Sequence, residues 1–147
     1  MKTNILLSAI IIAGLTFTGC KKEGCTDPDA TTYDSGAKKD DGTCTYEGKV
    51  VFWYGATASA GLLADTPPAT SLTIYVDGAV VGSSATSVFW TGSPECDQSG
   101  SVTVTKDMGG IKSLTSTYSV KDQIGYEYWS GIINFTANTC LAQELSW

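Results

Sequence analysis

The chain has 147 residues and a formal net charge of −6, a length that suits one domain with short appendages. It contains no histidine and its nine basic residues are all lysine, so histidine-dependent catalysis and histidine-ligated zinc are excluded. The missing arginine and the acidic balance also argue against nucleic acid as a partner.

The first element is an apolar run, Ile5–Leu15, that follows a short positively charged start. This run is too short to cross the roughly 30 Å hydrocarbon core of a bilayer as a permanent helix. Its length and position are instead typical of the core of a signal peptide.

Small residues and a cysteine follow this run. Gly19 immediately before Cys20 resembles a bacterial lipobox, although Phe17 stands where an aliphatic residue is usual. The resemblance implies cleavage after residues 1–19, a lipid on Cys20 and a short anchor linker over residues 20–23. It also implies membrane attachment at the cell envelope, in the outer membrane or at the cell surface. The alternative is an ordinary signal peptide followed by an incidental cysteine.

The cysteine count fits this interpretation. If Cys20 carries lipid, four cysteines remain, enough for two disulfides in an oxidising compartment. Three pairings are possible, and we favour Cys25–Cys44 and Cys96–Cys140 because each pair brackets a segment of uniform character. No CxxC spacing is present, so we expect the cysteines to be structural.

Residues 24–46 form an acidic segment bounded by two of these cysteines. It has no periodic apolar stripe and therefore depends on a disulfide for its order. Hard cations such as calcium bind carboxylate oxygens in short Asp- and Gly-rich loops. Candidate calcium ligands are Asp27, Asp29, Asp34, Asp40 and Asp41.

The same segment resembles a short module of secreted and surface proteins of Bacteroidota, with the approximate pattern CTDPxAxNYxxxAxxDDGSCxY. Thr32 replaces the usual Asn and Thr43 replaces the usual Ser. The matching residues are Cys25, Thr26, Asp27, Pro28, Ala30, Tyr33, Ala37, Asp40, Asp41, Gly42, Cys44 and Tyr46. The resemblance implies calcium as a cofactor, but we favour the alternative, a disulfide-closed spacer whose acids are simply solvated.

From residue 48 to 147 the pattern changes to alternating β-branched and aromatic residues, which predicts strands. The Asp77-Gly78 pair predicts a tight hairpin turn. No segment of ten or more residues shows helical periodicity, and residues 61–70 are expected to form a loop. The expected strands are 49–55, 71–76, 79–82, 87–90, 101–106, 114–120, 128–137 and 141–147.

This arrangement predicts an all-β fold, an antiparallel β-sandwich of the immunoglobulin-like or transthyretin-like kind, preceded by the acidic module. The Cys96–Cys140 bridge is expected to fasten the loop after Trp90 to a turn at one end of the sandwich. Residues 96–145 resemble a small β-domain of Bacteroidota lipoproteins, through Trp129, Gly131 and Cys140 among others.

Two kinds of site remain to be considered. Tyr126 and Tyr128 share one strand face and could form a binding patch. Trp129, and Trp53 or one of its neighbours, are expected to lie in the core. A carboxylate pair for glycan hydrolysis would come from Glu95 and Asp97, or from Asp122 and Glu127. All four acids lie in expected turns, so we predict no enzymatic activity.

The sequence therefore predicts a non-enzymatic, membrane-anchored lipoprotein with a structural or binding role toward a protein or glycan. The first alternative is a calcium-dependent binding module for adhesion or glycans. The second is a small carboxylate-dependent glycan hydrolase.

Overall fold

A computed structural model describes residues 21–147 of the chain, so the expected signal peptide and the lipid-bearing Cys20 lie outside the described residues. Within residues 21–147, seven strands and one helix form. In chain order they are β1 (Tyr46–Trp53), α1 (Ala56–Ala64), β2 (Ser71–Val76), β3 (Ala79–Ala85), β4 (Val102–Gly109), β5 (Ser113–Asp122), β6 (Glu127–Thr136) and β7 (Cys140–Glu144).

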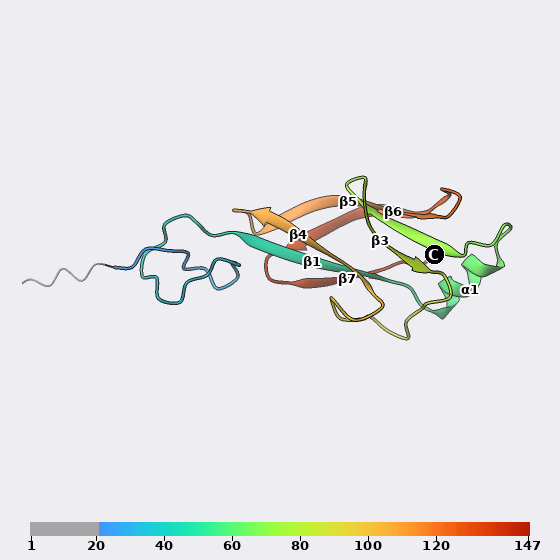
Figure 1. Cartoon of the computed structure of the whole chain (residues 1–147), viewed down its shortest axis with the longest axis horizontal. Coiled ribbons are helices and arrows are strands. Elements are labelled where there is room, and N and C mark those ends of the chain that lie inside the picture. Colours follow the sequence, from blue (N-terminus) through green and yellow to red (C-terminus); the bar gives the residue numbers. More distant parts are fainter. Residues whose placement is uncertain (1–20) are drawn as a thin grey trace, which may run out of the picture.

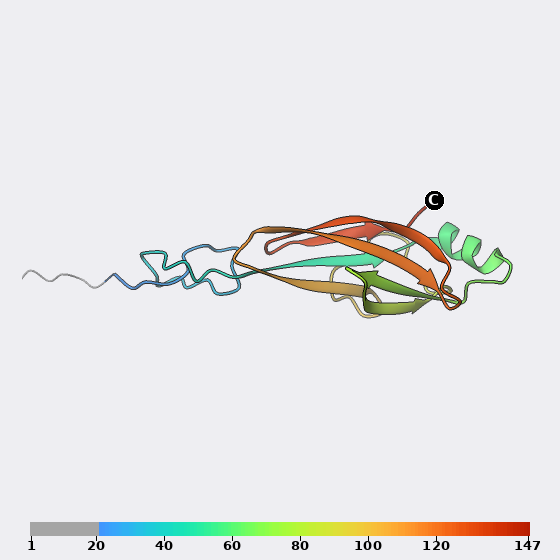
Figure 2. The same cartoon turned by 90° about the horizontal axis from the view of Figure 1, so that it is seen from above.

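The strands form two sheets that pack face to face (Figures 1 and 2). One sheet has the order β4-β1-β7 and the other has the order β3-β2-β5-β6. This confirms the predicted β-sandwich. One pairing departs from the antiparallel expectation, because β1 and β7 run parallel, from Lys49 beside Cys140 to Trp53 beside Glu144. Parallel pairing is possible here because the two strands are joined through the whole domain rather than by a tight turn.

Alternating side chains of both sheets build the core. Strand β2 shows the expected period of two, with Leu72, Ile74 and Val76 buried and the residues between them partly exposed. The largest fully buried apolar side chains are Phe135, Leu62, Leu72, Ile133, Leu145, Val50, Val51 and Val120.

The molecule is elongated, with the acidic module at one end and α1 at the other (Figure 1). We call the α1 end the distal end. The turn between β5 and β6 lies there too, because Asp122 pairs with Leu72 at the start of β2. Residues 145–147 also reach the distal end, since β7 runs parallel to β1.

Helix α1 was not expected from the sequence. Its nine residues are alanine-rich and favour a helix intrinsically, but they are too few to show a periodic apolar stripe. Tertiary contacts fix it: Leu62 is fully buried, and the buried Ser59 hydroxyl donates a 2.6 Å hydrogen bond to the Thr86 carbonyl. The helix ends at Ala64, before the two prolines, Pro67 and Pro68.

The expected strand over residues 87–90 is wrong. The ladder between β2 and β3 ends at Ser71 and Ala85, where β2 itself begins, so the chain beyond has no partner strand on that side. It turns instead, and the Trp90 backbone N–H donates to the Tyr54 carbonyl across 3.0 Å.

Both expected disulfides are present. Cys25 and Cys44 are bonded with their Cα atoms 4.9 Å apart, and Cys96 and Cys140 with theirs 5.9 Å apart. The second bridge fastens the loop after Trp90 to the first residue of β7, as expected. Strand β1 begins at Tyr46, so the last residue of the expected module is also the first of the sandwich.

Within residues 21–147, no helix has the length and apolar character needed to span a bilayer.

Candidate functional site

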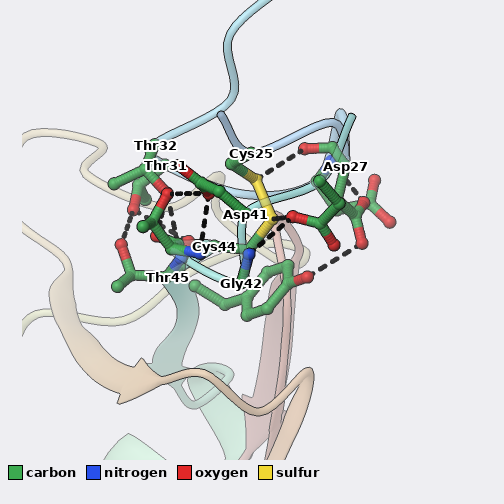
Figure 3. Close-up of a disulfide and its surroundings, with 12 residues drawn as sticks. Cys25, Asp27, Thr31, Thr32, Asp41, Gly42, Cys44 and Thr45 are labelled. Carbon is green, nitrogen blue, oxygen red and sulfur yellow. Dashed lines mark hydrogen bonds between the residues drawn. A yellow bond between two sulfur atoms is a disulfide. The ribbon is translucent and has the colours of Figure 1, made fainter. Parts of the chain in front are cut away.

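The five aspartates of the acidic module divide between contacts with the sandwich and local turns. The Asp27 carboxylate accepts a 2.8 Å hydrogen bond from the Tyr46 hydroxyl and lies 2.6 Å from the Lys112 ammonium (Figure 3). Lys112 also lies 3.2 Å from the Asp29 carboxylate. Since Lys112 precedes β5, these ion pairs fasten the module to the sandwich.

The other three aspartates hold local turns. Asp34 pairs with Lys22 at 2.6 Å and accepts from the Gly36 backbone. Asp40 accepts from the Gly42 backbone N–H. Asp41 accepts from both the backbone and the hydroxyl of Thr43. Among residues 21–147, no group of three or more acidic, histidine or cysteine side chains lies close enough to hold a metal ion. The structure therefore does not bring the predicted calcium ligands together.

These contacts explain the acidity of the module carboxyls. The ammonium of Lys112 is the main cause that lowers the pKa of Asp27, and that of Lys22 is the main cause that lowers the pKa of Asp34. The Thr43 hydroxyl lowers the pKa of Asp41. The three carboxylates are thus stabilised as anions by partners already present in the chain.

Among the carboxylates considered for catalysis, Asp97 and Asp122 have partners in the structure. Asp97 forms an ion pair with Lys49. Asp122 is buried and accepts from the backbone N–H groups of Ile124 and Tyr126, at 2.9 and 2.8 Å, so it holds the β5–β6 turn. The Asp122 Oδ1 atom is therefore held by the backbone of its own turn.

The aromatic residues at the distal end form an exposed cluster. Tyr126 and Trp147 are 61% and 65% exposed, which is unusual for side chains of this size. The Tyr126 and Tyr128 rings meet edge to face with centroids 4.9 Å apart, and Trp147 stacks on Trp129 at 4.8 Å. Tyr128 connects the two pairs, since its ring lies 6.0 Å from that of Trp147.

This cluster borders a groove of about 470 Å³, which we call the aromatic groove. One wall comes from the end of α1 and the other from β6 and the residues after β7. Its lining residues are Gly61, Ala64, Asp65, Tyr126, Glu127, Tyr128 and Trp147. A second hollow of about 300 Å³ continues from it along the β5–β6 turn, lined by Asp122, Ile124 and Pro67 in addition to shared residues.

Polar contacts hold the aromatic groove in shape. The Tyr128 hydroxyl donates a 2.7 Å hydrogen bond to the Asp65 carboxylate, joining β6 to the end of α1. This bond is the main cause that raises the pKa of Tyr128 to about 12 and lowers that of Asp65. The Gln123 amide N–H₂ donates to the Pro68 carbonyl across 2.9 Å, which ties the β5–β6 turn to the loop after α1.

Gly61 sets the position of the Trp147 ring. A Cβ atom at residue 61 would lie only 2.9 Å from Trp147 Cζ2, closer than real Cβ contacts. The indole therefore rests on the bare backbone of α1 on one side. The Trp147 ring also stacks on Trp129, whose indole N–H donates to the Ser146 carbonyl across 3.1 Å.

The structure separates the aromatic residues much as the sequence predicted. Tyr126 and Tyr128 do lie on a shared surface. Trp129 is half-buried and packs against the core. In the first strand, Phe52 is buried while Trp53 is half-buried.

Four residues of the aromatic groove were missed by sequence reasoning: Gly61, Ala64, Asp65 and Trp147. Each of these residues lies in α1, directly after α1 or after β7. Where these segments pack is decided by tertiary contacts, which the local sequence does not show. The one available signal was the aromatic residue Trp147, which the sequence placed in a strand that in fact ends at Glu144.

No protein-family model, curated protein sequence or solved structure matches this chain.

Proposed function

We propose that this chain is a non-catalytic, lipid-anchored binding module of the cell envelope, which binds a glycan in the aromatic groove. The observation that carries the proposal is the exposed ring cluster at the distal end. This end lies farthest from residue 21, which directly follows the lipobox-like Cys20. A lipid on that cysteine would leave the groove facing away from the membrane.

A glycan fits the chemistry of the groove. The C–H faces of a sugar ring are apolar enough to pack on tyrosine and tryptophan rings, while its hydroxyls need hydrogen-bond partners. The groove supplies both: the rings of Tyr126 and Trp147, and the carboxylates of Asp65 and Glu127. Its rings are already positioned by Gly61 and by the Tyr128–Asp65 bond, so little order has to be gained on binding.

The groove carboxylates are better suited to binding a glycan than to hydrolysing it. A glycosidase needs one carboxyl with a raised pKa to protonate the leaving group. The Tyr128 hydroxyl and the Thr66 backbone N–H lower the pKa of Asp65, which is the opposite shift.

A glycan array probed with the full chain in neutral detergent tests the binding proposal. We expect Tyr126→Ala and Trp147→Ala each to weaken binding about tenfold, the worth of one well-placed aromatic contact. Tyr33→Ala is the matched control, because Tyr33 is a similarly exposed ring in the acidic module. Absence of glycan binding, or equal losses in all three variants, would refute the proposed site.

The anchor is tested separately in cells. Mass spectrometry of the envelope fraction should find Cys20 as a lipid-modified N-terminus. Cys20→Ser should release the chain from the membrane, and an unmodified N-terminus elsewhere in the leader would contradict the anchor.

A further inference from the structure

The charged residues that line the aromatic groove are both acidic. Its lining includes two carboxylates, Asp65 and Glu127, and no lysine from residues 21–147. The continuing hollow adds a third carboxylate, Asp122, again without a lysine among its lining residues. Lys121 contacts one of the groove residues, since its ammonium lies 3.8 Å from the Glu127 carboxylate. The same ammonium lies 5.6 Å from the centre of the Tyr75 ring.

The partners of these carboxylates leave the groove negative. Asp65 is bound by a neutral hydroxyl and a backbone N–H, neither of which cancels its charge. Glu127 is exposed, and its contact with Lys121 is long and solvent-screened. The whole chain adds to this field, with a formal net charge of −6.

Aromatic rings around a negative groove favour a cationic ligand. A cation placed over the face of a tyrosine or tryptophan ring is attracted by the ring quadrupole, and a nearby carboxylate adds a direct charge contact. Three rings and two carboxylates border the same space here, so one ligand group could contact both kinds.

We propose that the aromatic groove selects a glycan unit that carries a free ammonium group, that is, an unacetylated amino sugar. This rests on the proposed function and names its ligand class. The sugar ring packs on Trp147 and Tyr126, and its ammonium lies between the ring faces and Glu127. Glycans with carboxylate, sulfate or phosphate groups are repelled by the same field.

The test compares two oligosaccharides of equal length and linkage, oligomers of glucosamine and of N-acetylglucosamine. Calorimetry with the full chain in neutral detergent is run at a pH below the pKa of the sugar amine. We expect the glucosamine oligomer to bind about fivefold more tightly, the size of one exposed cation–ring and ion-pair contact. This preference should shrink as salt is added, because exposed charge contacts are screened.

Glu127→Gln should remove most of the preference, because glutamine keeps a hydrogen-bonding side chain but carries no charge, so the affinity for the glucosamine oligomer should fall more than the affinity for the N-acetylated oligomer. Glu47→Gln is the matched control, since Glu47 is an exposed acid at the module end of β1. Because Glu127 is exposed, both variants are expected to keep the parent melting temperature, which scanning calorimetry checks.

The outcomes separate the two proposals. Equal affinity for both oligomers, or a preference that survives both added salt and Glu127→Gln, overturns the amino-sugar inference and leaves glycan binding intact. Failure of both oligomers, combined with a glycan array on which no glycan binds, overturns both.

Discussion

Asp77 contacts two strands outside its own turn. It adopts a φ of 49° in the β2–β3 hairpin, a conformation that asparagine and aspartate tolerate well. Its carboxylate accepts from the Lys106 ammonium at 2.8 Å, the Ser116 hydroxyl at 2.9 Å and the Thr117 backbone at 3.0 Å. One side chain therefore joins the hairpin to β4 and β5, and these contacts lower its pKa to about 2.

We expect Asp77→Asn to lower the free energy of unfolding by about 1 kcal/mol at neutral pH, because the side chain is partly exposed and its ion pair is screened. Asparagine keeps the turn conformation, so the loss reports the charge contacts. Urea unfolding measures it. Asp107→Asn is the control, since that carboxylate contacts the Gly109 backbone and is expected to matter less.

The same residue sets a pH dependence. The folded pKa of Asp77 lies below the unfolded value of about 3.9, so its contribution is complete above roughly pH 4 and is lost as the pH falls through about 2. Unfolding curves of the parent protein should lose stability across that window. The Asp77→Asn variant should lose less, and parallel curves would contradict the assignment.

Helix α1 contains Gly61, which weakens the helix intrinsically but allows the close contact with the Trp147 ring. Gly61→Ala should stabilise the helix intrinsically, by up to about 1 kcal/mol. The new Cβ would nevertheless displace the Trp147 ring, which has room to move because it is largely exposed. We expect an unchanged or higher melting temperature together with a shifted tryptophan emission and weaker glycan binding.

Gly92→Ala is the control for that experiment, because a Cβ there meets nothing within 4 Å. If Gly61→Ala left both the tryptophan emission and the glycan affinity unchanged, the groove would not depend on the packing of Trp147 against Gly61 of α1.

The acidic module is a second element whose position depends on few contacts. Lys112 reaches it from the sandwich, pairing with Asp27 and Asp29 and lying 5.5 Å from the centre of the Tyr46 ring. We expect Lys112→Gln to speed amide hydrogen exchange in residues 25–45 without changing exchange in β2 or β5. Lys38→Gln is the control, since Lys38 forms no ion pair within the part of the chain that the structure describes. Equal exchange in both variants would show that the Lys112 ion pairs do not order the module.

The two disulfides stabilise different parts of the molecule. The Cys96–Cys140 bridge closes a 44-residue separation across the sandwich, whereas Cys25–Cys44 closes 19 residues of module. On the chain-entropy account these loops contribute roughly 4 and 3 kcal/mol. We expect Cys96→Ser with Cys140→Ser to lower the melting temperature of the sandwich. Cys25→Ser with Cys44→Ser should instead leave that temperature nearly unchanged and disorder the module.

Calorimetry of the two double variants distinguishes these results. A similar drop in both would mean that the module and sandwich unfold as one cooperative unit.

The parts of the fold that sequence predicted are those with a local cause. The Asp77-Gly78 turn needed a residue pair that tolerates positive φ, and the alternation in β2 followed from one buried face. Helix α1 was missed because it owes its place to the fully buried Leu62 and the Ser59 contact with Thr86.

The residues of the candidate site likewise divide into those that the local sequence predicts and those that only the tertiary fold brings in. Tyr126 and Tyr128 were found because a strand places alternate residues on one face. Asp65 and Trp147 were not, because they join that face from segments 63 and 19 residues away from Tyr128, as their contacts with Tyr128 show. The five module aspartates suggested one metal site because they are close in sequence. In the structure Asp27 and Asp29 pair with Lys112, while Asp34, Asp40 and Asp41 hold local turns.

The parallel pairing of β1 and β7 has a mechanical consequence. A pull between residue 21 and the distal end would draw β1 and β7 past each other lengthwise. Their hydrogen bonds, extended by those of Lys49 N–H to Thr139 and Leu145 N–H to Trp53, would then share the load at once instead of opening one by one. The Cys25–Cys44 bond would carry the same load past the 19-residue module separation, so that segment could not be drawn out. The chain is therefore built to resist tension along its own length.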